Sequence, residues 1–132
     1  MSNSPNKLAH LDMIQRVIDR QASNSSNAKG WNVGLVSAIF FLSSASDGDA
    51  IAAIALLPSA MFWLLDAYYL HQERAFRSLY DKVRSTPEVD IDFSMQTDAK
   101  PSGVPAFISP SVAWFHGPIF LASLFAAAIT VG

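Results

Sequence analysis

Three apolar segments alternate with polar sequence along this chain of 132 residues. They cover residues 31–46, 50–70 and 111–132, and a helix needs about 20 apolar residues to cross a bilayer. We therefore predict an all-α membrane protein with three transmembrane helices, helical cytosolic extensions and a short extended cytosolic segment. A polar turn at residues 47–49 would join the first two spans on the outer side.

The first apolar segment is the shortest, and its polar flanks would bring it to spanning length. A cleaved signal peptide is the alternative, which the long hydrophilic sequence in front of it disfavours. Gly34 and Ala38 form a pair of small residues that would allow close approach of another helix. In front of this segment, residues 23–27 and Gly30 are poor helix formers, so we expect a frayed or kinked helix there.

The second apolar segment continues without Gly or Pro into a charged helix at residues 71–85. An apolar stripe follows one face of this extension: Phe76, Leu79, Tyr80 and Val83. Residues 1–30 carry a matching stripe, and we expect the two helices to pack antiparallel as a cytosolic stalk. The alternative is that the helix of residues 1–30 lies flat on the membrane. However, such helices favour an excess of Lys and Arg. Pro58 lies inside the second span and predicts a kink.

A proline-rich loop at residues 86–110 separates the stalk from the third span. Within it, residues 89–95 alternate apolar and polar side chains, which is the period of a half-buried strand. Val89, Ile91 and Phe93 are its apolar members. Either this strand lies along the helices of its own protomer, or it pairs with another chain and contributes to an oligomer or partner contact.

The distribution of basic residues predicts the orientation. All nine Lys and Arg residues precede the first span or lie between the second and third. By the positive-inside rule, the N-terminus and residues 71–110 are cytosolic and the C-terminus is periplasmic. Trp31, Trp63 and Trp114 then fall near the cytosolic interface as an aromatic belt in contact with membrane lipid.

Composition excludes several classes of function. The chain is 51% hydrophobic and only 15% charged, whereas soluble domains carry about 25% charged residues. It lacks cysteine, and it shows no metal-ligand spacing, phosphate loop or nucleophile triad. We therefore expect no enzyme activity, cofactor, metal or nucleic-acid partner.

Asp66 is the sharpest candidate for chemistry, because ionisable residues inside spans are costly and are often functional. Asn32 on the first span and His116 on the third lie at a similar depth, so we expect the three to form a polar cluster. Lys29 or Trp31 would also be in reach. The cluster either ties the three helices together or acts as a gate that senses protons or ions.

The strings LDMIQRVIDRQASNSSNAKGWNVGLVSAIF, LPSAMFWLLDAYYLHQERAFRSLYDKVR and SPSVAWFHGPIFLASLF resemble a family of small bacterial inner-membrane proteins. The most specific part runs from Phe62 to Tyr80. The resemblance implies a link to TIR-domain or nucleotide-signalling proteins of antiphage defence, and it carries over no catalytic residues. Our first hypothesis is an oligomeric membrane effector or pore controlled through its stalk by a cytosolic signalling protein. A membrane scaffold that recruits a soluble partner without transport is the alternative.

Overall fold

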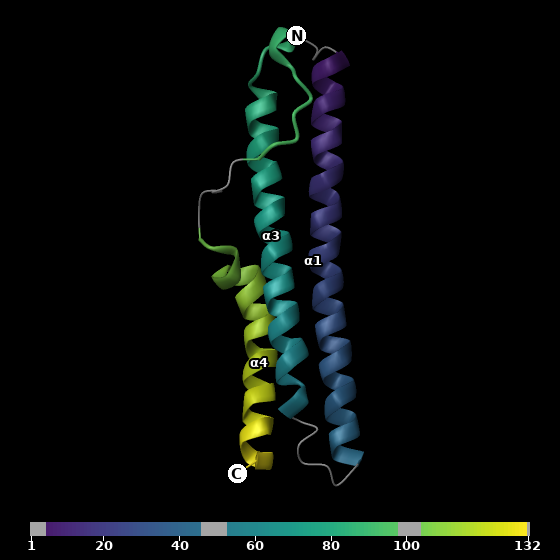
Figure 1. Cartoon of the computed structure of the whole chain (residues 1–132), viewed down its shortest axis with the longest axis vertical. Coiled ribbons are helices and arrows are strands. Elements are labelled where there is room, and N and C mark those ends of the chain that lie inside the picture. The colour runs from purple at the N-terminus through teal and green to yellow at the C-terminus, as the bar shows by residue number, and fades with distance from the viewer. Residues whose placement is uncertain (1–4, 46–52, 98–103, 132) are drawn as a thin grey trace.

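The computed structural model describes residues 5–45, 53–97 and 104–131, with side chains as far as Ile129 (Figure 1). Three long helices make up most of this part: α1 (Pro5–Ala45), α3 (Leu56–Arg84) and α4 (Pro110–Val131). Two single turns of 3₁₀ helix, Glu88–Asp90 and Ala106–Ile108, lie between α3 and α4. The prediction of an all-α fold is confirmed for the described residues. The predicted turn at residues 47–49 lies outside them.

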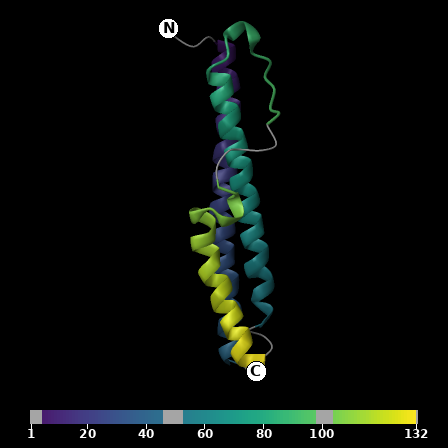
Figure 2. The ribbon, with the colours of Figure 1, turned by 90° about the vertical axis from the view of Figure 1, so that its left-hand side faces the viewer.

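The molecule is elongated, with α1 and α3 antiparallel along its whole length and α4 beside one half of α3 (Figures 1 and 2). One end is therefore a two-helix unit, which we call the stalk (residues 5–24 and 71–97). The other end is a three-helix unit, which we call the bundle (residues 31–45, 56–65 and 110–131). Residues 25–30 and 66–70 join the two.

One continuous helix, α1, runs through both units, so the predicted fraying or kink at residues 23–27 and Gly30 is wrong. At 1.5 Å per residue α1 is about 60 Å long. Intrinsic propensity is a weak preference that tertiary contacts override. Here the polar residues of the segment supply contacts, because Ser25 and Lys29 both bond to α3.

The stalk has a conventional hydrophobic core. The two predicted apolar stripes face each other, and they bury Leu11, Ile14, Ile18, Leu79 and Val83. Phe76, Tyr80, Ile91 and Met95 pack around this core and are partly buried. Leu79 and Val83, expected at an oligomer or partner contact, are therefore occupied within the chain.

The segment that follows α3 is not a strand, so the prediction for residues 89–95 is wrong. Residues 88–90 form a 3₁₀ turn, residues 91–97 have no regular structure, and Phe93 has a positive φ of 55°. Two of the segment's apolar side chains, Ile91 and Met95, pack on the stalk core. Ile91 lies against the core, whereas Val89 is 89% exposed. The segment thus lies along its own protomer, which was one of the two alternatives.

The Glu88 carboxylate fixes the beginning of this segment by capping α1. It accepts hydrogen bonds from the backbone N–H groups of Asn6 (3.2 Å) and Lys7 (2.9 Å). These donors belong to the first turn of α1 and have no partner inside that helix. The start of α1 therefore depends on a residue far along the chain.

The bundle reverses the burial pattern of the stalk. Its outward side chains are large and apolar, including Phe41, Leu57, Met61, Leu64, Leu121, Phe125 and Ile129. Its buried side chains are small or polar, including Val36, Ser59, Val112, Ser123 and Ala127. Within the described residues, one helix, Pro110–Ile129, is long and apolar enough to cross a membrane by length and composition, with a mean hydropathy of 1.7.

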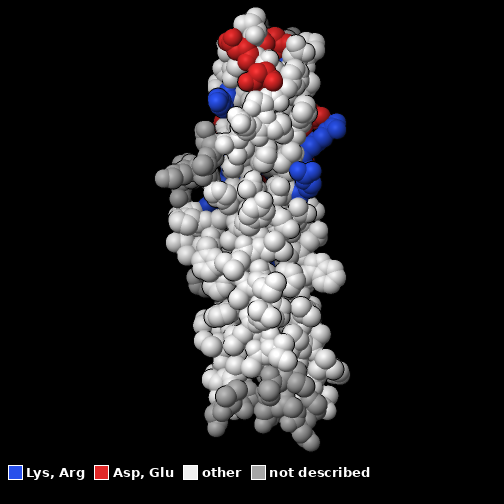
Figure 3. All heavy atoms as spheres, viewed as in Figure 1, with Lys and Arg blue, Asp and Glu red and all other residues white. Residues whose placement is uncertain are grey.

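Among the described residues, charge is confined to the stalk and to its junction with the bundle. The described Lys, Arg, Asp and Glu residues lie at positions 7–29 and 66–92. On the face shown in Figure 3 they are all in the stalk half. Asp66 is the charged residue nearest the bundle along α3, and it is fully buried.

Pro58 does not lie in the middle of a helix as expected. Ala53 and Ile54 are helical, Ala55 forms a turn, and α3 begins at Leu56. The proline ring cannot accommodate the helical carbonyl four residues earlier, so regular helix is interrupted just before it. The predicted kink within residues 50–70 is thus an interruption at Ala55, and Pro58 occupies the first turn of α3.

Candidate functional site

All three helices meet at a buried polar cluster where the stalk joins the bundle. Asp66 from α3, His116 from α4 and Asn32 from α1 are each completely inaccessible to solvent. His116 Nε2 lies 2.8 Å from Asp66 Oδ2, and Asn32 Nδ2 lies 2.6 Å from His116 Nδ1. The structure therefore brings together the three residues expected to form the cluster.

With the Asn32 amide in its present orientation, these contacts indicate which tautomer of a neutral imidazole fits the site. The Asn32 amide nitrogen is a donor, so His116 Nδ1 accepts its hydrogen bond. The hydrogen of a neutral imidazole then lies on Nε2, which donates to the Asp66 carboxylate. A linear chain of hydrogen bonds results, from α1 through α4 to α3.

Two further α1 side chains complete the site around Asp66. Lys29 Nζ lies 2.5 Å from Asp66 Oδ2, and the Ser25 hydroxyl donates to Oδ1. Lys29 Nζ also donates to Ser25 Oγ at 3.0 Å. Ser25, Lys29 and Asn32 share one face of α1 because their spacing follows the helical period. The Asp66 carboxylate is consequently neutralised by a lysine whose side chain is only 23% exposed.

The cluster contains unused hydrogen-bonding capacity. Asn32 Oδ1 is buried and has no hydrogen-bond partner among the described residues, and the same is true of Ser59 Oγ. Rotation of the Asn32 amide by half a turn would place Oδ1 against His116 Nδ1. In that arrangement His116 Nδ1 would be the donor of the hydrogen bond.

A second set of contacts positions α4 so that His116 reaches Asp66. The Trp63 indole stacks on Phe107, with ring centroids 4.8 Å apart, and its Nε1 donates to the Phe107 carbonyl at 3.0 Å. Arg74 donates to the Val104 carbonyl and, at 3.0 Å, to Ser109 Oγ. These bonds attach residues 104–109 to α3 immediately before α4 begins.

The three tryptophans lie within one helical turn of the cluster along their own helices. Trp31 precedes Asn32, Trp63 is one turn from Asp66, and Trp114 is close to His116. Trp31 and Trp114 are 68% and 79% exposed, so Trp31 does not take part in the cluster. Trp63 is half-buried because it packs on Phe107 and on the edge of Phe120.

The remaining predicted contact residues lie outside this site. Gly34 and Ala38 are exposed on α1, and a methyl group built on Gly34 would meet nothing within 4 Å. Phe93 is 40% exposed, with its ring 5.5 Å from that of His10. None of these side chains contacts the Asp66 cluster.

Sequence reasoning missed Ser25, which it assigned to a weak stretch of helix, and left Lys29 only as a neighbour in reach. The signal was the spacing of Ser25, Lys29 and Asn32 along one helix face. Since α1 and α3 run antiparallel, this face of α1 lies opposite Asp66 on α3. Within the described residues, no three His, Cys, Asp or Glu side chains gather as metal ligands would. What the cluster does show is a set of hydrogen bonds and an ion pair that links all three helices.

No protein-family model, curated protein or solved structure matches this chain.

Proposed function

We propose that this protein is a homo-oligomeric membrane effector whose membrane part is coupled to a cytosolic stalk through the Asp66 cluster. The observation that carries the proposal is the hydrogen-bonded chain from Lys29 and Asp66 through His116 to Asn32. It joins three helices at the level where charged surface gives way to apolar surface. A displacement of the stalk helices would act on α4 through this connection.

Three membrane spans are the first part of the proposal. The bundle exposes large apolar side chains on all three helices and buries small or polar ones. In water this arrangement would be unfavourable, because monomeric soluble proteins rarely expose such extended apolar patches. Lipid contact explains it. Residues 31–46, 50–70 and 111–132 would then cross the bilayer, with lipid tails around their outward faces.

The orientation follows from charge. The described basic residues all lie in the stalk or at its junction with the bundle. The positive-inside rule therefore favours a cytosolic stalk and a periplasmic C-terminus, in a bacterial inner membrane. Trp31 and Trp114, exposed beside the junction, are suited to the interface at that level.

Oligomerisation is needed for a pore. Three helices in one chain enclose no pathway, and the bundle interior is filled by side chains such as Val36, Val112 and Ala127. Gly34 and Ala38 offer an uncovered surface of small residues at which another helix could approach closely. A pore would therefore form between protomers. The suggested role in antiphage defence, under a cytosolic signalling protein, rests on the family resemblance of residues 62–80.

A membrane scaffold without transport is the second candidate, and one observation favours it. The outward surface of the bundle is almost entirely apolar, so a water-filled pathway would have few polar groups to line it. In this case the stalk would recruit a soluble protein, and the Asp66 cluster would only fix the helices.

Forced clustering of the stalk distinguishes the two. An inducible dimerisation domain is fused to the N-terminus, and membrane potential is followed in cells with a voltage-sensitive dye. An effector should depolarise the membrane when the inducer is added, whereas the same fusion carrying Gly34→Leu should not. If cross-linking shows oligomers but the potential is unchanged, the scaffold is correct. A chain that stays monomeric at all concentrations contradicts the effector.

A further inference from the structure

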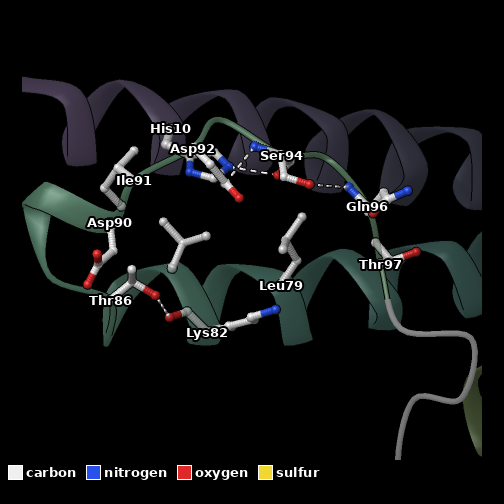
Figure 4. Close-up of a pocket in the computed structure, with 11 residues that line it drawn as sticks. His10, Leu79, Lys82, Thr86, Asp90, Ile91, Asp92, Ser94, Gln96 and Thr97 are labelled. Atoms are coloured by element: carbon white, nitrogen blue, oxygen red, sulfur yellow. Dashed lines mark hydrogen bonds between the residues drawn. The ribbon is translucent and has the colours of Figure 1, made fainter.

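A cavity of about 520 Å³ opens at the end of the stalk farthest from the bundle. It lies between the last turns of α3 and the segment that crosses from α3 to the start of α1 (Figure 4). Leu79, Val83 and Ile91 supply its apolar surface. Small-molecule sites in proteins usually measure about 300–1,000 Å³, so the volume is sufficient for a ligand.

The charged groups around this cavity favour a cation. Asp90 and Asp92 are exposed lining residues, and neither forms a salt bridge within the described residues. Asp92 is held in place because its Oδ1 accepts the backbone N–H of Ser94 at 3.0 Å. Lys82 is the one Lys or Arg side chain in the lining. The carboxylates therefore outnumber the ammonium group.

Helix ends reinforce this imbalance. The cavity adjoins the C-terminal end of α3, where the peptide dipoles place partial negative charge. The positive N-terminal end of α1 lies nearby, and the Glu88 carboxylate binds two of its free N–H groups, those of Asn6 and Lys7. The carbonyl end of α3 adds partial negative charge to the carboxylates of the cavity, and Lys82 and Arg84 in its last turn offset part of it.

The polar groups of the wall are mainly acceptors. His10 is 1% exposed, its Nε2 bonds to the Ser94 carbonyl at 2.8 Å, and its Nδ1 has no partner in the described residues. A neutral imidazole that donates through Nε2 keeps a lone pair on Nδ1. The Thr86 hydroxyl donates to the Lys82 carbonyl, which leaves its oxygen lone pairs available. An ammonium group, which has donors only, complements these groups.

We propose that this cavity binds a small organic cation that carries ammonium groups on an aliphatic chain, as an aliphatic polyamine does. The chain lies on Leu79, Val83 and Ile91, and an ammonium group lies between the carboxylates of Asp90 and Asp92. A lysine side chain of a peptide offers the same chemistry, so the experiment includes both sources. The proposal is independent of the proposed membrane function.

Calorimetric titration of the full chain in detergent tests the site, with spermidine and tetralysine as the two probes. Exposed ion pairs contribute about 0.2–1 kcal/mol each. The double variant Asp90→Asn, Asp92→Asn should therefore bind about two- to thirtyfold more weakly. Lys82→Gln should bind more tightly, because it removes a like charge. Asp12→Asn is the matched control, since Asp12 is an exposed carboxylate outside the cavity, and it should leave affinity unchanged.

Comparison of the two probes distinguishes the two sources of the ammonium group. Tighter binding of spermidine supports a free small cation, and tighter binding of tetralysine supports a peptide source. Equal affinities of the double variant and the Asp12 control would overturn the site. So would weaker binding by Lys82→Gln, or the absence of heat with both probes. Asparagine retains an oxygen acceptor for the Ser94 N–H, and circular dichroism verifies that the double variant is folded.

Discussion

One carboxylate oxygen of Asp66 serves two helices at once. Its Oδ2 atom lies 2.8 Å from His116 Nε2 on α4 and 2.5 Å from Lys29 Nζ on α1. Because Asp66 itself belongs to α3, a single atom links all three elements. Loss of this oxygen would leave an ammonium group and an imidazole without their acceptor in a place that water reaches poorly.

Asp66→Ala should therefore destabilise the protein strongly. Removing one partner of a buried ion pair costs about 3–5 kcal/mol, because the other charge remains buried and uncompensated. Unfolding followed by circular dichroism in detergent measures the loss. Asp66→Asn keeps an oxygen that can accept from His116, so it should retain the assembly and lose less stability. If Asp66→Ala unfolds at the same point as Asp81→Ala, an exposed control, the cluster does not hold the helices together.

Glu88→Ala should weaken the stalk by a moderate amount. It removes the acceptor of the Asn6 and Lys7 backbone N–H groups, and loss of a helix cap costs about 0.5–2 kcal/mol. Hydrogen exchange at the first turn of α1 is the direct measurement, and it should accelerate there and not in α4. Unchanged exchange at residues 6 and 7 would show that the cap is not formed in solution.

Ile91→Lys and Val89→Lys form a matched pair on one short segment. Ile91 packs on the stalk core, so a lysine there loses apolar burial and should cost about 1–3 kcal/mol. Val89 is 89% exposed, and a lysine there should change stability by less than about 0.5 kcal/mol. Thermal unfolding of both variants gives the comparison. Equal effects would mean that residues 88–97 do not lie on the helices.

Gly34→Leu should separate folding from assembly. A side chain at Gly34 meets nothing within 4 Å of its Cβ, so the chain should fold normally. The added bulk should, however, prevent another helix from approaching closely, and the oligomer should dissociate in detergent. Ala128→Leu adds the same bulk at an exposed position of α4 and should leave the oligomer intact. Multi-angle light scattering reports both masses, and an unchanged mass for Gly34→Leu would exclude this face as the interface.

Two engineered cysteines test the orientation, because the chain has none of its own. Ser44, near the end of α1, and Ser78, in the stalk, are both exposed. With a cytosolic stalk, an impermeant maleimide should label Ser44→Cys in cells whose outer membrane is made permeable. Ser78→Cys should react only after the inner membrane is lysed. The reverse result would invert the proposed topology.

The helices could be predicted from the sequence because apolar periodicity reports which face of a helix is buried. The stripes that contain Leu79 and Val83 lie in the stalk core as their spacing indicates. The conformation of residues 89–95 was harder to predict. Alternating apolar and polar side chains occur both in a strand and in an irregular segment that lies along two helices. Two contacts with α1 distinguish the cases: Glu88 accepts from the N–H groups at the start of α1, and His10 of α1 bonds to the Ser94 carbonyl.

The cluster was predictable in part for a similar reason. Asp66, His116 and Asn32 stand out as polar residues in apolar surroundings. Ser25 does not stand out, because its neighbours in residues 23–27 are also serine or asparagine. Its hydrogen bond to Asp66 could not be inferred from the sequence. Its contact with Asp66 depends on the register of α1 against α3, which tertiary packing determines.

The Glu88 cap has a consequence for biosynthesis. A ribosome releases the first turn of α1 long before it reaches Glu88, which lies 81 residues beyond Lys7. During that interval the amide groups of this turn must be bound by water or by another protein. The nascent N-terminus therefore stays open to binding factors until the segment after α3 has been translated, and completion of the stalk is a late event in the making of the protein.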